Sequence, residues 1–150
     1  MTQRPILFSA EMVRAILDGS KTQTRRKMKP QPSTVDDAGR WYRMESGGES
    51  LMNSAYPCPY GKPGDTLCVP ETEPRITLRI TDVRVERLQD VSRQDCVAEG
   101  CAGGHGSIPG YPYSATPREH FHHIWNTIYG AGAWEANPWV WVISFERVNP

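Results

Sequence analysis

The sequence has no long hydrophobic segment. A membrane-spanning helix candidate needs about 18 consecutive apolar residues, and the 150 residues contain no such stretch. The apolar stretch 6–8 is too short for the core of a signal peptide. These absences argue against a helical membrane protein and against a secreted one. We therefore expect a cytoplasmic protein with no membrane partner.

An excess of charge of either sign is also missing. Seventeen Lys and Arg residues balance 17 Asp and Glu residues, so the formal net charge is 0. A neutral chain does not attract polyanions as a whole, and contact with nucleic acid would have to come from a local cluster of cations. The hydrophobic fraction of 38% is typical of a folded protein and not of a disordered one.

No Cys-x-x-Cys pair occurs in the chain. The cysteines are Cys58, Cys68, Cys96 and Cys101, and in the cytoplasm we expect them to be free thiols. A zinc site that combines some of them with His120, His122 or His123 is the alternative, but the spacing fits known zinc sites poorly. We interpret the cysteines as ordinary core or surface residues and expect no metal and no cofactor.

Periodicity and capping signals predict an α+β fold in a single domain over 1–150. Helices are predicted over 10–18, from Ser92 to Gly100, and from Thr116 to Gly130. Strands are predicted at 4–8, 22–28, 66–69, 75–87 and 138–148. The alternation in 75–87 slips by one residue near Thr81-Asp82, which predicts a β-bulge. The strand 138–148 is apolar on both faces, which is typical of a central, covered strand.

Two segments lack periodicity. The segment at about 29–63 is rich in Pro, Gly, Ser and Asp, and we expect a long irregular loop, mobile without ligand, with at most one short strand at 41–44. The segment 101–114 is a Gly-, Pro- and Tyr-rich loop, in which Tyr111 and Tyr113 are candidates to stack on a base. Their alternative role is structural.

The segment 19–29 has the highest local density of cations. Its five basic residues are Lys21, Arg25, Arg26, Lys27 and Lys29. The hydroxyls of Thr22 and Thr24 and the amide of Gln23 lie between them. Cations attract phosphate, whereas hydroxyls and amides make directional hydrogen bonds, so the segment is a candidate RNA-binding site. A solvated basic turn is the alternative.

The remaining conspicuous side chains have a structural interpretation. The helix and strand periodicities place Trp125, Trp139, Trp141 and Phe145 in the core, and base-stacking platforms are the alternative. His120 and His123 share one helix face, and we interpret them mainly as solvated.

Several blocks of the chain, in order, resemble the ASCH domain family. They are Pro5-Ile6-Leu7-Phe8-Ser9 with Gly19–Arg26, Tyr60–Asp65, Val69–Thr72, Ile80–Leu88, Ala98-Glu99-Gly100 and Asn137–Val142, and the last is similar to the form carried by phage and prophage members. The resemblance covers nearly the whole chain. It implies a PUA-like small β-barrel flanked by about three helices, with a cleft that binds RNA or a modified cytidine nucleoside.

The resemblance also implies candidate site residues. One bacterial branch of similar proteins converts N4-acetylcytidine to cytidine and acetate, and its Lys, Thr and Glu match Lys21, Thr24 and Glu99. In this hypothesis Thr24 is the nucleophile, Lys21 the base and Glu99 the acid, with Glu71 as a second candidate acid. The candidate substrate- or RNA-binding residues are Thr22, Gln23, Arg25, Arg26, Lys27 and Glu71.

Other functions remain open at this point. A non-catalytic RNA-binding module, an RNA-cleaving ASCH protein, and a phage accessory protein that acts through a protein partner are the alternatives. The sequence also departs from phage relatives, because Cys68 and Pro70 stand where Trp and Arg are usual and the segment after Thr72 is short. The oligomeric state is not predicted.

Overall fold

The computed structural model describes residues 3–52, 57–73 and 75–148. Its main element is a five-stranded sheet with the order β1-β6-β7-β8-β2, in which β1 pairs with β6 in parallel and the other neighbours are antiparallel. The strands are β1 (Gln3–Pro5), β2 (Gln23–Lys27), β6 (Thr66–Val69), β7 (Ile76–Arg87) and β8 (Trp139–Val148). The α+β class is confirmed. The strand order is open among the described residues, with β1 and β2 at its two edges.

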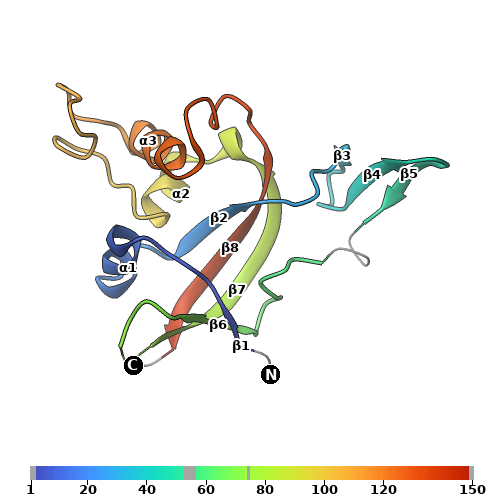
Figure 1. The fold of residues 1–150 in the computed structure, drawn as a ribbon, viewed down its shortest axis with the longest axis horizontal. Helices are drawn as coiled ribbons and strands as arrows, with labels where there is room; N and C mark the ends of the chain where they lie inside the picture. The colour runs from blue at the N-terminus through green and yellow to red at the C-terminus, as the bar shows by residue number, and fades with distance from the viewer. Residues whose placement is uncertain (1–2, 53–56, 74, 149–150) are drawn as a thin grey trace.

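Three helices flank this sheet, and Figure 1 shows α2 and α3 side by side and apart from α1. They are α1 (Ala10–Leu17), α2 (Arg93–Ala98) and α3 (Pro117–Tyr129), and a short 3-10 turn, η1 (Leu88–Asp90), leads from β7 toward α2. Each helix begins as predicted, because the side chains of Ser9, Ser92 and Thr116 accept hydrogen bonds from main-chain N–H groups in the first turn. Thr116 and Glu119 form a complete capping box.

The predicted irregular segment contains a second sheet. Its three strands are β3 (Thr34–Val35), β4 (Trp41–Glu45) and β5 (Gly48–Leu51), in the order β3-β4-β5. This sheet extends away from the helices in Figure 1. The expectation of a structureless loop was therefore wrong for 34–51, although the strand at 41–44 was predicted. Residues 53–56 of the loop lie outside the described residues.

The long strands follow the predicted pattern. The pairing of β7 with β8 shifts register between Ile80 and Asp82, which is the predicted bulge. β8 lies between β7 and β2 and is covered on both faces. Val140 and Val142 pack in the cluster with α3, whereas Trp141 and Ile143 pack in the cluster with α1 and β4. This central strand therefore separates two hydrophobic cores.

Several residue-level predictions are tested by this packing. All four cysteines are free thiols, as expected. Trp125, Trp141 and Phe145 are buried, and Trp139 is half-buried. His120, predicted to be solvated, is instead buried, and its Nδ1 accepts a hydrogen bond of 3.2 Å from the N–H of Gly103. No helix within the described ranges is long and apolar enough to cross a membrane.

Candidate functional site

A pocket of about 280 Å³ lies between the segment before α1, the edge of β2, and α3. One part of its wall is apolar and aromatic and includes Phe8, Met12, Phe121, Trp125, Ile128 and Tyr129. The other part is polar and consists of Lys21, Thr24, Arg25, Arg26 and Glu99. The pocket thus brings together the three residues of the proposed Lys, Thr and Glu group, which are 78 positions apart at most along the chain.

Lys21 and Glu99 form a buried ion pair at the polar end. Lys21 Nζ lies 3.0 Å from Glu99 Oε1 and also donates to the main-chain carbonyls of Glu99 (2.8 Å) and Gln23 (3.0 Å). The two side chains are only 3% and 6% exposed. All three donors of the ammonium group therefore have protein acceptors.

The end of α2 positions this pair. Glu99 is the C-cap residue of α2 and forms an isolated β-bridge with Lys21. The next residue, Gly100, has a φ of +98°, and a Cβ there would lie 3.2 Å from the Cβ of Ala15. A residue without a side chain lets α2 end directly against α1 and the start of β2.

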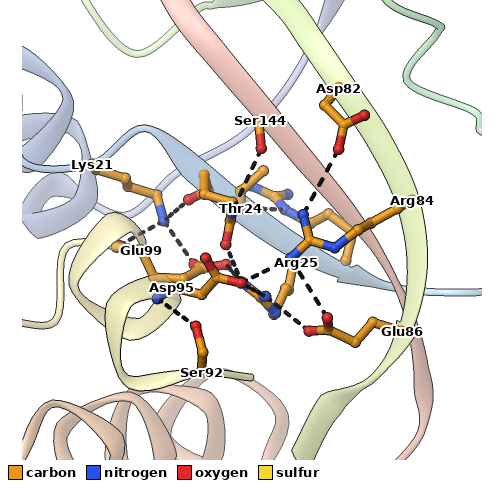
Figure 2. Close-up of polar contacts among 12 residues, drawn as sticks. Lys21, Thr24, Arg25, Asp82, Arg84, Glu86, Ser92, Asp95, Glu99 and Ser144 are labelled. Carbon is orange, nitrogen blue, oxygen red and sulfur yellow. Dashed lines mark hydrogen bonds and ion pairs between the residues drawn. The ribbon is translucent and has the colours of Figure 1, made fainter. Parts of the chain in front are cut away.

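Arg25 is the most highly coordinated side chain of the site. Its guanidinium donates to Glu86 at 2.9 Å, to Asp95 at 3.1 Å and to Glu99 at 3.1 Å. Figure 2 shows these carboxylates converging on Arg25 from β7 and α2. Burial disfavours the charged guanidinium, but the charges and hydrogen bonds of Glu99 and Glu86 outweigh it and raise the pKa of Arg25.

Arg84 extends the same cluster toward solvent. It lies 2.8 Å from Asp95, 3.5 Å from Glu86 and 3.7 Å from Asp82. Three cations, Lys21, Arg25 and Arg84, thus face four carboxylates, Asp82, Glu86, Asp95 and Glu99. This cluster has no surplus positive charge.

The structure therefore corrects the interpretation of 21–29 as one continuous basic patch. Lys21 and Arg25 are neutralised inside the protein, and Arg26 is half-buried. Only Lys27 and Lys29 are exposed cations. The local cation density in the sequence overestimates the free charge because the partner carboxylates come from β7 and α2.

Thr24 and Arg26 lie on the face of β2 opposite to the side chain of Arg25. Thr24 Oγ1 accepts a hydrogen bond of 3.2 Å from Arg26 Nε, and Arg26 Nη2 donates to the carbonyl of Leu7 at 2.8 Å. The Arg26 guanidinium also lies over the Phe8 ring, 4.9 Å from its centroid. Thr24 is thus in the pocket, but among the hydrogen bonds of the described residues its hydroxyl contacts Arg26 and not Lys21.

The other predicted binding residues lie beside the pocket. Gln23 is buried and bonds to Arg25 and Ser144. Thr22 is exposed, and Lys27 lines a second hollow that shares Trp125 and Tyr129 with the pocket. Glu71 accepts a hydrogen bond of 3.0 Å from the N–H of Phe8 and so holds the main chain at the rim.

Sequence reasoning missed the exposed part of the apolar wall. Leu7, Ile128 and Tyr129 are 65%, 58% and 44% exposed, although they are large and hydrophobic. The helical spacing of Ile124, Trp125 and Ile128 puts them on one face of the helix, which is typical of a core face. The available signal in the sequence was that the end of this helix carries more apolar residues than its core face requires. This signal is weak.

The comparisons with known proteins give structural matches but no sequence matches. No family model and no curated protein sequence matches the chain. The structure resembles the crystal structure of an ASCH domain from Lactobacillus crispatus JV V101, with a TM-score of 0.53 and 12% identity over 97% of this chain and 79% of that chain. An NMR structure of a protein from Pyrococcus furiosus has a TM-score of 0.47 and 15% identity over 99% of this chain and 100% of that chain. At these identities the likeness concerns the fold alone, and the fold resembles that of the ASCH domain from Lactobacillus crispatus.

Proposed function

We propose that the pocket binds a nucleoside of the cytidine type, either free or at an unpaired position of RNA. The observation that carries the proposal is the meeting of an aromatic wall and a polar end in one small pocket. Small-molecule sites generally combine an apolar lining with a few directed polar groups. A nucleoside has the matching parts, since its flat base can pack on aromatic rings while its polar edge is hydrogen-bonded.

The charge distribution favours a nucleoside over a long stretch of RNA backbone. Lys21 and Arg25 are neutralised by carboxylates, so they provide no free charge for phosphate. Lys27 and Lys29 are exposed and lie next to the pocket along the chain. They suit contact with one or two phosphates flanking a bound nucleoside, which keeps RNA as a partner.

Hydrolysis of N4-acetylcytidine is the second candidate function. The observation in its favour is that Lys21 Nζ is 3.0 Å from Glu99 Oε1 within the pocket that also contains Thr24. Transfer of one proton from Lys21 to Glu99 would produce the neutral amine and neutral acid that the hypothesis needs. Arg25 opposes this transfer, because its hydrogen bond to Glu99 stabilises the carboxylate.

The chemical step follows from these roles. Neutral Lys21 would accept the Thr24 hydroxyl proton as Thr24 Oγ1 bonds to the acetyl carbon, and Glu99 would protonate N4 as the C–N bond breaks. Water would then hydrolyse the acetyl ester on Thr24 and release acetate. Because Thr24 contacts Arg26 in this structure, Lys21 must approach Thr24 when substrate binds.

The PUA-like barrel and the phage type belong to the same proposal and rest on the family resemblance.

Calorimetric titration with cytidine and with N4-acetylcytidine tests the binding proposal. The variant Tyr129→Ala removes a stacking surface from the pocket, and loss of one base–aromatic stack weakens binding by about tenfold. Leu51→Ala is the matched control, because Leu51 has a similar exposure of 48% but lies on β5. Unchanged affinity in Tyr129→Ala, or no binding of either nucleoside, would contradict the proposal.

Product analysis separates the enzyme from the binding protein. N4-acetylcytidine is incubated with the wild type and with Thr24→Val, and the formation of cytidine and acetate is followed. Turnover by the wild type that disappears in Thr24→Val while N4-acetylcytidine binding persists would support hydrolysis. Binding without product in the wild type would leave a nucleoside-binding protein.

A further inference from the structure

The pocket lies along a free edge of the main sheet. In the order β1-β6-β7-β8-β2, strand β2 pairs with β8 on one side and is the last strand on the other. A free strand edge presents main-chain N–H and C=O groups that a neighbouring molecule can pair with. The floor of the pocket therefore contains main-chain groups as well as side chains.

The register shows which main-chain groups these are. The carbonyl of Thr22 accepts from Phe145 N–H, and Met28 N–H donates to the carbonyl of Trp139. Because hydrogen-bonded and non-hydrogen-bonded pairs alternate in an antiparallel ladder, the even-numbered residues of β2 bond to β8. The N–H and C=O of Gln23, Arg25 and Lys27 consequently point away from β8, and the bond from Lys21 Nζ to the carbonyl of Gln23 agrees with this direction.

Arg25 presents its main chain to the pocket. Its side chain is 0% exposed, yet the whole residue retains 3% exposure and lines the pocket. The accessible atoms of Arg25 are therefore main-chain atoms. The register directs its N–H and C=O away from β8, so these groups do not bond within the ladder. Among the described residues, neither group has another hydrogen-bond partner. Main-chain polar groups in a mostly apolar pocket need a partner, which is water or a ligand.

The side chain of Arg25 holds this main chain rigidly. Its contacts to Glu86, Asp95 and Glu99 fix it from two other elements, β7 and α2. A donor and an acceptor that are already held in place lose little freedom when a ligand binds. Arg25 is thus suited to recognition through its backbone while its guanidinium serves as an anchor.

We propose that the main-chain N–H and C=O of Arg25 select the base, by pairing with a ring edge that carries a hydrogen-bond acceptor next to a donor. The N3 atom and 4-amino group of cytosine form such an edge. The N–H of Arg25 donates to N3, and its carbonyl accepts from the 4-amino group. This inference rests on the proposed nucleoside function and names the part of the base that the pocket recognises.

A ligand that lacks the 4-amino donor should bind more weakly than the loss of its contact area alone implies. Without the 4-amino group the carbonyl of Arg25 loses its partner inside the pocket, and an unsatisfied buried acceptor weakens binding by about tenfold or more. The probes are cytidine and its 4-deamino analogue, which keeps the ring, N3 and the ribose. Their affinities are compared by calorimetry on the full chain.

Amide NMR spectra of the full chain provide the residue-specific readout. Titration with cytidine should shift the Arg25 amide strongly downfield, while the Arg26 amide, which faces β8, moves little. Equal affinities for cytidine and its 4-deamino analogue, or an unmoved Arg25 amide with cytidine bound, would overturn this inference and leave nucleoside binding intact. No binding by either probe would overturn both proposals.

Discussion

At the scale of single residues, the site is dominated by buried charges that satisfy one another. Glu99 accepts from Lys21 at 3.0 Å and from Arg25 at 3.1 Å, and its side chain is 6% exposed. Removal of one partner from a buried ion pair leaves an uncompensated charge in a low-dielectric environment. The same residues that make the pocket polar therefore contribute to the stability of the fold.

The first prediction concerns this buried carboxylate. Glu99→Gln should lower the free energy of unfolding by about 3 kcal/mol, because two buried cations lose their shared counter-charge. The measurement is urea denaturation followed by tryptophan fluorescence. Glu146→Gln is the matched control: Glu146 pairs with Arg79 at 2.9 Å but is 56% exposed, and exposed pairs contribute little. Equal effects of the two variants would show that burial does not determine the loss of stability.

The second prediction concerns pH and His120. Burial lowers the pKa of His120 below its ordinary value of 6.5, with Glu11 acting in the opposite direction and His123 in the same direction. The folded protein thus binds a proton less readily than the unfolded chain. The stability associated with neutral His120 is complete above about pH 6.5. It is lost as the pH falls through the pKa of His120 in the folded protein.

The measurement is the free energy of unfolding at pH 7.0 and pH 5.5. His120→Asn can still accept from Gly103 N–H but does not titrate, so the loss of stability between these pH values should be smaller in the variant. An identical pH dependence in the wild type and in His120→Asn would contradict the assignment of this loss to His120.

At the scale of elements, the loop between α2 and α3 positions the pocket wall. Gly104 forms an isolated β-bridge with Ala115, and Gly103 N–H donates to His120 on α3. These contacts set where α3 begins, and α3 carries the aromatic side of the pocket. Both positions favour glycine through their backbone conformation, and Gly103 also lacks space for a side chain.

The third prediction separates these reasons. A Cβ on Gly103 would collide with the carbonyl oxygen of Ala115 and lie 2.9 Å from the carbonyl carbon of Thr116, whereas a Cβ on Gly104 meets nothing within 4 Å. Both residues have positive φ values, +76° and +101°. Gly103→Ala should therefore destabilise the protein by at least about 2 kcal/mol more than Gly104→Ala in thermal unfolding. Similar losses would mean that backbone conformation alone decides both positions.

At the scale of the whole molecule, the neutrality of the chain should govern the salt dependence of the proposed RNA binding. The formal net charge is 0, and the cations of the buried cluster face carboxylates. Among the described residues of 21–29, the cations without an ion pair to a carboxylate are Arg26, which is half-buried in the pocket wall, and the exposed Lys27 and Lys29. A protein that neutralises few phosphates releases few counterions, and its affinity depends weakly on salt.

The fourth prediction follows from this charge distribution. For a short single-stranded RNA, the slope of log affinity against log salt should be shallow, about −1.5 or smaller in magnitude. The double variant Lys27→Gln, Lys29→Gln should remove most of the slope, while cytidine affinity changes little with salt in either protein. Fluorescence anisotropy from 50 to about 300 mM salt measures the slopes. A steep slope that survives the double substitution would place the RNA surface elsewhere.

The small sheet shows why some elements escape prediction from sequence. β4 and β5 lie in a segment rich in Gly, Ser and Pro, which has the composition of a loop. The sheet is nevertheless anchored, because Trp41 is 1% exposed and packs edge-on against Trp141 of β8. A long-range contact of this kind leaves no local pattern that periodicity can detect.

The helix starts and the bulge in β7 were predictable from the sequence, because capping bonds span only three residues and a phase slip is visible in the side-chain alternation. Which cations of 21–29 are free depends on the packing of distant elements. The carboxylates that neutralise Arg25 are 61, 70 and 74 positions away along the chain. Charge density in sequence is a local quantity, whereas the neutralisation of a buried charge depends on which distant elements pack against it.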